Sequence, residues 1–141
     1  MHQYAQNSRD KSQLRALLVD SVRLFVGLND SELDSLLSVS RPISVKARSI
    51  VCRKGEPGDA LYIVISGKLK VAAMSEDGRE AILAILEDGE TFGEMSLLDE
   101  HPRSANVIAV QDSELLVIQR QDFSAYLVSH PKVAISLLGI L

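Results

Sequence analysis

The stretch FGEMSLLDEHPRSA, residues 92–105, combines residue types that can bind an anion. Gly93 can adopt backbone angles that other residues avoid, and we expect a short helix from Glu94 to Leu98. The unsatisfied N–H groups in the first turn of a helix attract anions. Arg103 can return across the turn and offer two parallel N–H donors to the same anion. The stretch therefore predicts a phosphate-binding site.

A carboxylate, Glu94, stands within this predicted anion site. Carboxylates accept hydrogen bonds from sugar hydroxyls, as acidic residues do in dinucleotide sites, so the expected ligand carries a phosphate and a sugar hydroxyl close together. The surrounding β-rich runs would offer apolar walls to a flat base. The alternative is that Glu94 and Arg103 form an ion pair that pins the short helix, since solvated ion pairs are common and contribute little stability.

Motifs of other chemistry are missing from the sequence. The glycines of GEPGD, residues 55–59, lack the Lys-Ser/Thr that would hold a nucleoside triphosphate and magnesium. The three histidines, His2, His101 and His130, have no metal-ligand spacing with each other or with Cys52. Neither a Gly-x-Ser-x-Gly elbow nor an HExxH motif occurs. We therefore expect a protein that is not an enzyme and that holds no metal and no cofactor.

Composition limits the class of protein further. The 141 residues are 46% hydrophobic, which is enough to bury the core of a single domain. The net charge of -4 argues against general binding of nucleic acid or of an anionic membrane. The single cysteine excludes an intramolecular disulfide, and no apolar run is long enough to span a bilayer. We expect a cytoplasmic protein without a signal peptide.

Four parts follow one another along the chain. They are a flexible N-terminal arm at 1–12, helices within 14–40, a β-rich region at 43–119 and C-terminal helices at 120–141. In the β-rich region Gly67, Gly78 and Gly89 are spaced eleven residues apart. Strand spacing of about 8–12 residues is typical of an all-β sandwich or barrel. We expect Gly67 to mark a bend or bulge rather than chemistry.

Helix signals frame this β-rich region. Asn29 or Asp30 can cap a helix that carries an apolar stripe of leucines, and Arg41-Pro42 would end it. The last segment, residues 131–141, is apolar nearly all round and must be covered on most sides. Because it reaches Leu141 without a C-cap, we expect either a truncated helix or one that packs on a partner. The alternative is a helix that packs into the core of its own domain.

The residues Phe-Gly-Glu-Met-Ser-Leu, followed by Pro-Arg-Ser-Ala, resemble the phosphate-binding cassette of cyclic-nucleotide-binding domains. Four further stretches, LNDSELDSLL, GEPGDALYIVISGKLKV, GRE and FSAYLVSHPKVAISLL, resemble the bacterial Crp/Fnr family of transcription regulators. The resemblance covers about residues 24–141. It implies a mainly β domain at 13–141, in which an antiparallel β-roll with N- and C-terminal helices encloses a cyclic nucleotide.

The resemblance also implies eight ligand-binding residues. These are Gly93, Glu94, Met95, Ser96, Arg103, Ser104, Val71 and Leu83. Glu94 would accept a hydrogen bond from the ribose 2′-hydroxyl, whereas Arg103 and Ser104 would bind the cyclic phosphate. Gly93 and the backbone of the two residues after Glu94 would line the sugar and phosphate. The two strand residues would form the apolar wall of the pocket.

A sensory role follows from the resemblance. The ligand would be cyclic AMP rather than cyclic GMP, although a serine at position 104 is compatible with either. Ligand binding would control a DNA-binding domain that these residues do not contain, in a homodimer formed through the C-terminal helix. The alternatives are a structural or dimerisation β-roll that binds no nucleotide, and a regulatory module of a kinase or a channel.

Overall fold

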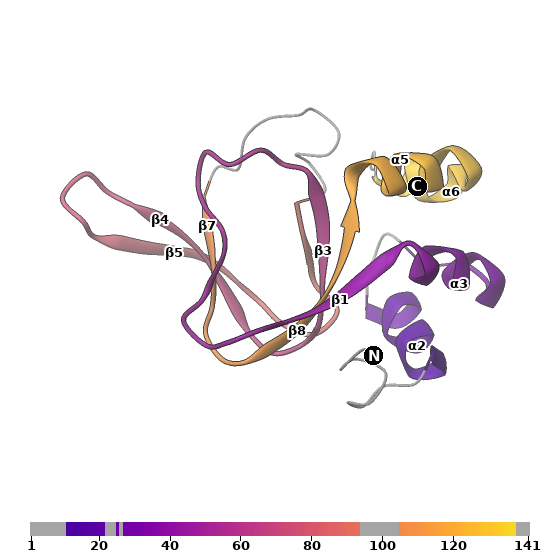
Figure 1. Ribbon diagram of the computed structural model, residues 1–141, viewed down its shortest axis with the longest axis horizontal. Helices are drawn as coiled ribbons and strands as arrows, with labels where there is room; N and C mark the ends of the chain where they lie inside the picture. The colour runs from indigo at the N-terminus through magenta and orange to yellow at the C-terminus, as the bar shows by residue number, and fades with distance from the viewer. Residues whose placement is uncertain (1–10, 22–24, 26, 94–104, 138–141) are drawn as a thin grey trace.

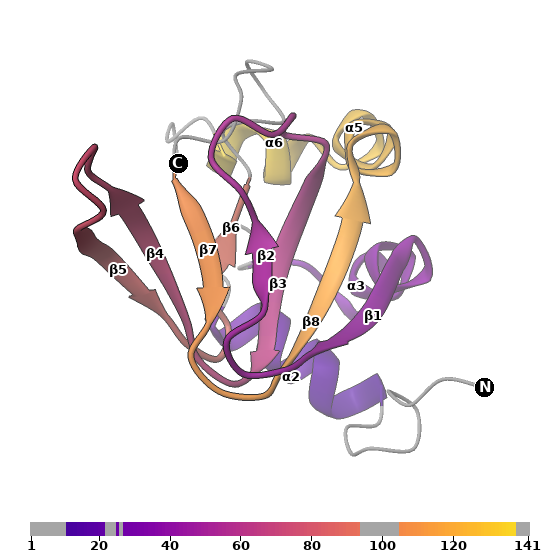
Figure 2. The same ribbon diagram turned by 60° about the vertical axis from the view of Figure 1, so that its left-hand side comes forward.

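The computed structural model describes residues 11–21, 25, 27–93 and 105–137, and within them eight strands form two four-stranded sheets (Figures 1 and 2). One sheet has the strand order β1-β8-β3-β6 and the other the order β2-β7-β4-β5. The strands are β1 (Ser40–Val45), β2 (Ile50–Cys52), β3 (Ala60–Ser66), β4 (Leu69–Met74), β5 (Glu80–Leu86), β6 (Thr91–Phe92), β7 (Asn106–Ala109) and β8 (Ser113–Gln119). All these strands pair antiparallel, which confirms the predicted fold class.

The helices of the described residues lie together on one side of the first sheet, and the β4–β5 hairpin extends on the opposite side (Figure 1). They are α2 (Lys11–Ser21), α3 (Asp30–Ser38), α5 (Arg120–Ser129) and α6 (Pro131–Leu137). Helix α2 begins at Lys11, inside the segment predicted as a flexible arm. Its first turn includes Leu14, which is buried. None of these helices is long and apolar enough to cross a membrane.

Two apolar clusters lie on opposite faces of the first sheet. The helix cluster, between this sheet and the helices, contains Leu14, Leu18, Phe25, Leu28, Leu33, Leu36, Leu61, Ile63, Ile65, Leu116, Ile118, Phe123, Tyr126 and Val133. The roll cluster, between the two sheets, contains Cys52, Val64, Leu69, Leu86, Phe92, Val107, Ala109 and Leu115. Strands β3 and β8 contribute to both clusters because alternate residues of a strand point to opposite faces. Their sequences therefore read as continuous apolar runs.

Local signals set the start of α3 and the entry to β1. The Asn29 side chain accepts a hydrogen bond from the backbone N–H of Glu32 at 2.9 Å, and the Glu32 carboxylate accepts one from Asn29 N–H at 3.0 Å. This capping box confirms the predicted cap at Asn29. The first strand starts at Ser40, before the predicted start at Ile43, so Pro42 lies inside it. Proline is tolerated there because β1 is an edge strand.

Tyr126 joins α5 to α3. Its side chain is buried, its hydroxyl donates to the backbone carbonyl of Glu32 at 2.9 Å, and its ring stacks on that of His130. Burial, with a further contribution from the charge of Glu32, raises the pKa of Tyr126 from 10.0 to about 12. The folded protein therefore favours the neutral hydroxyl, which can donate this hydrogen bond.

We predict that Tyr126→Phe lowers the free energy of unfolding by about 1 kcal/mol at neutral pH, because it removes one intramolecular hydrogen bond. The advantage of the wild type over the variant should shrink as the pH rises from 10.0 to about 12. In that range the unfolded tyrosine loses its proton while the folded one keeps it, so stability falls with pH. Urea unfolding of both proteins measures this difference, and a difference that stays constant over the range would contradict the burial of this hydroxyl.

The turn between β3 and β4 requires glycine at position 67. Gly67 has φ +126°, and a Cβ built on it would lie 2.8 Å from Ser113 Cα and would overlap the Ser113 side chain. Ser113 is held in place, because its Oγ accepts a hydrogen bond from Lys68 N–H at 3.2 Å and donates to the Gln111 carbonyl at 2.9 Å. The β3–β8 register shifts between Val64 and Ser66, directly before the glycine. The predicted bend at Gly67 is confirmed.

Gly67→Ala should therefore lower the free energy of unfolding by about 3 kcal/mol, from backbone strain and from the clash with Ser113. Gly78→Ala is the matched control. Gly78 has φ +84° but no atom within 4 Å of a built Cβ, so we expect only the backbone cost of about 1 kcal/mol. Urea denaturation compares the two variants, and equal losses would show that the Ser113 contact does not constrain the turn.

Candidate functional site

Three of the eight predicted ligand-binding residues lie within the described part of the chain. These are Gly93, Val71 and Leu83. The other five, Glu94, Met95, Ser96, Arg103 and Ser104, fall in residues 94–104, as does the predicted short helix, and lie outside the described residues. The described residues on either side of this segment lie in β6 and β7 or directly beside them. The segment connects β6 of the first sheet to β7 of the second.

An aromatic pair fixes the residue before Gly93. Phe92 pairs with Tyr62 of β3, and the two rings stack with their centroids 4.6 Å apart and their planes within 2°. Phe92 is buried in the roll cluster, against which Tyr62 also packs. Gly93 follows with φ +96°, a conformation that favours glycine, as its place in the sequence predicts.

A hydrogen bond between the first residue of β7 and the β2–β3 loop holds the chain just after the segment. Ala105 is buried, and the side-chain oxygen of Asn106 accepts a hydrogen bond from the backbone N–H of Lys54 at 2.8 Å. Lys54 lies in the loop between β2 and β3. Asn106 also pairs with Ala72 of β4. The first residue of β7 is therefore attached both to its own sheet and to the β2–β3 loop.

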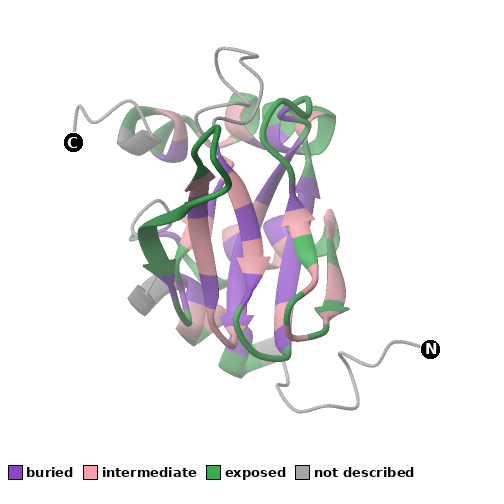
Figure 3. Cartoon of the chain, turned by 90° about the vertical axis from the view of Figure 1, so that its left-hand side faces the viewer, coloured by how far each residue is buried: buried purple, intermediate pink, exposed green. Residues whose placement is uncertain are grey.

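Val71 and Leu83 lie on adjacent strands of the second sheet, next to a β-bulge. Val71 pairs with Ala84 and Ala72 pairs with Ile82, so Leu83 is the extra residue of β5. Val71 packs against the roll cluster, whereas Leu83 is 61% exposed. Bulges re-aim side chains and are common near binding sites. Figure 3 shows that β5 is exposed along most of its length.

The described residues that flank segment 94–104 contribute to one apolar surface. Phe92, before the segment, and Val107, after it, both belong to the roll cluster, and Val71 packs against the same cluster. Val71 is the direct partner of Val107 across β4 and β7. The arrangement offers an apolar surface inside the roll, between the described residues that flank segment 94–104.

In the exposed turn of the β4–β5 hairpin, a hydrogen bond from Ser75 lowers the pKa of Asp77 and helps to close the turn. Within the described ranges, no group of three or more His, Cys, Asp or Glu side chains could hold a metal ion.

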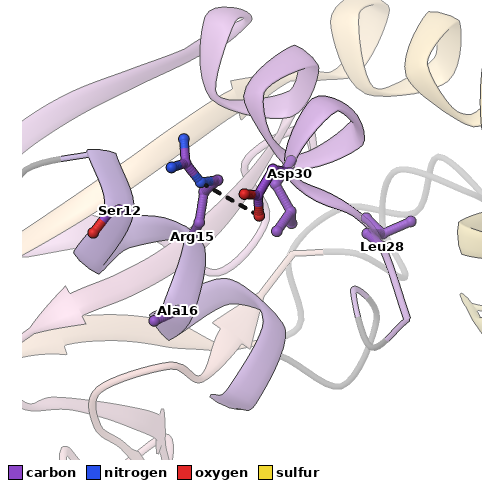
Figure 4. Close-up of a pocket in the computed structure, with 6 residues that line it drawn as sticks. Ser12, Arg15, Ala16, Leu28 and Asp30 are labelled. Carbon is purple, nitrogen blue, oxygen red and sulfur yellow. Dashed lines mark ion pairs between the residues drawn. The ribbon is translucent and has the colours of Figure 1, made fainter.

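A separate cavity of about 250 Å³ lies between α2 and α3 (Figure 4). Its lining residues are Ser12, Arg15, Ala16, Leu28, Asp30 and Leu33. The Arg15 guanidinium is 2.9 Å from a carboxylate oxygen of Asp34 and 3.6 Å from one of Asp30. Two carboxylates thus neutralise this cation, and the lining includes none of the three predicted ligand-binding residues that the structure describes. The cavity is a poor candidate for a phosphate site.

Comparison with known proteins shows the family to which this architecture belongs. The chain matches the family model of the cyclic nucleotide-binding domain over residues 42–130. The protein belongs to this family. The resemblance of residues 92–105 to a phosphate-binding cassette is thus part of a match that includes all the strands from β2 to β8.

Three relatives of this cyclic nucleotide-binding domain come from different kinds of protein. It is 42% identical over 118 residues to the cyclic AMP receptor protein of Thermus thermophilus, a match that covers 84% of this chain and 55% of that protein. The crystal structure of the N-terminal domain of a transcriptional regulator from Streptomyces coelicolor A3(2) is 33% identical, with a TM-score of 0.77 over 87% of this chain and 86% of that one. A co-crystal structure of the regulatory domain of Toxoplasma gondii PKA with cAMP is 30% identical, with a TM-score of 0.76 over 84% of this chain and 46% of that one. The chain spans about half the length of this Thermus thermophilus protein and of a CRP-like cAMP-activated global transcriptional regulator of Mycobacterium tuberculosis.

Sequence reasoning missed two contacts that hold the ends of segment 94–104. The stack of Tyr62 on Phe92 and the bond from Lys54 to Asn106 each join residues far apart in the chain. The available signal was that Phe92 and Asn106 lie close to the segment in the sequence, which could have marked them as residues that hold it. Their partners come from strand pairing and loop placement, which no local pattern specifies.

Proposed function

We propose that this domain binds a cyclic mononucleotide inside its β-roll and passes the binding signal to an attached effector, with no catalysis of its own. The observation that carries the proposal is that Phe92 and Val107, which flank segment 94–104, both lie in the roll cluster of a chain that matches the cyclic nucleotide-binding family. The apolar surface suits a purine base, and the segment carries the groups that suit a phosphate and a ribose.

The polar roles fall on residues of the segment itself. In this proposal Arg103 binds the cyclic phosphate through its two-pronged guanidinium, with Ser104 as a second donor. Glu94 accepts a hydrogen bond from the ribose 2′-hydroxyl, and Gly93, with the backbone of residues 95–96, lines the sugar and phosphate. The carboxylate of Glu94 argues against a site for phosphate alone, since it would repel a simple anion.

Cyclic AMP is the ligand that we propose, ahead of cyclic GMP. The support comes from the relatives, one of which is named a cyclic AMP receptor protein and another of which was crystallised with cAMP. Ser104 does not choose between the two bases. The preference therefore depends on the apolar wall, to which we assign Val71 and Leu83.

The two strands that are buried on both faces provide a route from the ligand to the helices. Residues of β3 and β8 pack against the roll cluster on one face and against the helix cluster, including Phe123 of α5 and Val133 of α6, on the other. A ligand that prefers one packing of the roll therefore biases the position of these helices.

The effector that we propose is a DNA-binding domain. One of the similar structures is the N-terminal domain of a transcriptional regulator. The regulator would work in the cytoplasm as a homodimer formed through the C-terminal helix. A kinase or a channel is the alternative effector, since the chain is also similar to a PKA regulatory domain and to a cyclic nucleotide-gated potassium channel of Rhizobium etli.

The phosphate assignment predicts that Arg103→Ala abolishes binding of cyclic AMP while the fold is retained. Arg103→Lys should also bind poorly, because an ammonium keeps the charge but loses the bidentate fork. Glu94→Gln should weaken cyclic AMP moderately, by about tenfold or less, since a neutral amide accepts a weaker hydrogen bond. Calorimetric titration with cyclic AMP and cyclic GMP, beside circular dichroism to verify the fold, measures all three. Normal binding by the alanine variant would overturn the phosphate site, whereas a folded wild type that binds neither nucleotide would favour a structural β-roll.

Leu83→Ala separates ligand binding from stability. Because Leu83 is 61% exposed, its truncation should change the free energy of unfolding by no more than about 0.5 kcal/mol. If it forms the base wall, the affinity for cyclic AMP should fall several-fold through lost apolar contact. Val128→Ala, at an 84% exposed position of α5, is the control that should change neither quantity. Unchanged affinity in the Leu83 variant would remove this residue from the wall.

A further inference from the structure

We propose that Asn106 is a positioning residue for the nucleotide phosphate, acting through the end of the segment that carries Arg103. The inference rests on the proposed function and extends it to a residue outside the predicted cassette. Asn106 touches no ligand in this proposal. Its role is to hold the first residue of β7 in place. Arg103, the proposed phosphate ligand, precedes this residue by three positions in the chain.

The bond that Asn106 makes joins it to a well-anchored loop. Its side-chain oxygen accepts from Lys54 N–H at 2.8 Å. The residue before Lys54 is held in a tight turn, since Arg53 N–H donates to the Glu56 carboxylate at 2.7 Å and Glu56 N–H donates to the Arg53 carbonyl at 3.1 Å. The other end of the loop is tied to the start of α5, where Arg120 donates to the carbonyls of Gly58 and Asp59.

The position of Asn106 makes this anchor relevant to the phosphate. Arg103 is three residues earlier, so their Cα atoms are at most about 11 Å apart. Between them, Ala105 is buried and resists displacement. A bidentate contact to a phosphate requires placement to within about 0.5 Å. A small shift of the start of β7 is therefore enough to misalign the guanidinium fork.

The sheet alone does not provide this anchor. Asn106 is the first residue of β7, and its pairing with Ala72 is the last rung of the β4–β7 ladder. The end of a ladder is its weakest part, because the terminal pair has a neighbouring rung on one side only. The bond to Lys54 attaches this end to a second element. A neutral side chain serves here without adding a negative charge near an anionic ligand.

We predict that Asn106→Ala weakens binding of both cyclic AMP and cyclic GMP by about fivefold, the value of one hydrogen bond. The ratio of the two affinities should stay at its wild-type value, because the phosphate is common to both ligands while the base is not. A residue with a merely structural role in the apolar wall would change that ratio.

Asp112→Ala is the matched control. The Asp112 side-chain oxygen accepts from the backbone N–H of Ala47, also at 2.8 Å, so it makes a bond of the same chemical type between segments far apart in the chain. It lies in the turn after β7, at the opposite end of the strand from Asn106 (Figure 2). We expect a similar loss of thermal stability in the two variants but an affinity within about twofold of wild type for Asp112→Ala.

The test is calorimetric titration of the wild type and both variants with each nucleotide, beside thermal unfolding. Normal affinity in Asn106→Ala, an equal loss in the Asp112 control, or a changed ratio of the two nucleotides would each overturn the positioning role while leaving the proposed function intact. A folded wild type that binds neither nucleotide would overturn the proposed function, and this inference would fall with it.

Discussion

The burial of β3 and β8 on both faces is the constraint on which the rest of the structure depends. Apolar residues of these strands point to both sides of the sheet. Ile63 and Leu116 face the helices, while Val64 and Leu115 face the interior of the roll. The same two strands therefore hold the helices on one side and the second sheet on the other. A change in the roll interior that alters the packing of β3 and β8 therefore also alters the packing of α5 and α6, because close-packed interiors transmit strain.

Long-range contacts hold the described residues on either side of segment 94–104. The segment leaves the first sheet after the Tyr62–Phe92 stack and enters the second sheet at Asn106, whose side chain is bonded to the β2–β3 loop. The chemistry of the segment can then be set by the residues within it, while long-range contacts set where it begins and ends. This division of roles is common in binding loops that rigid scaffolds support.

Much of the fold could be predicted from the sequence because local signals were strong. Asn29 caps α3, and the three evenly spaced glycines Gly67, Gly78 and Gly89 all adopt positive φ. Burial could not be predicted in the same way. The runs ALYIVI in β3 and EAILAIL in β5 are similarly apolar, yet β3 is buried on both faces and β5 is an exposed edge strand. Which strand receives neighbours on both sides is decided by non-local pairing, which apolar runs do not encode.

The family of the domain was predictable from the sequence, whereas the contacts that flank segment 94–104 were not. The match to the cyclic nucleotide-binding family confirms the resemblance that residues 92–105 suggested. Pro42 showed the limit of local rules, since it was expected to end a helix and instead lies within the edge strand β1. The partners of Phe92 and Asn106 depend on the register of strands and the placement of loops, so only the folded structure reveals them.

The most direct test of the account is an NMR titration of the ¹⁵N-labelled domain with cyclic AMP. We expect the largest shifts of the assigned amides at Gly93, at Ala105 to Val107 and around Val71, which surround the roll cluster. Smaller shifts should follow in α5 and α6 through β3 and β8. Shifts centred instead on Arg15 and the α2–α3 cavity, with the roll residues unchanged, would contradict the placement of the nucleotide inside the β-roll.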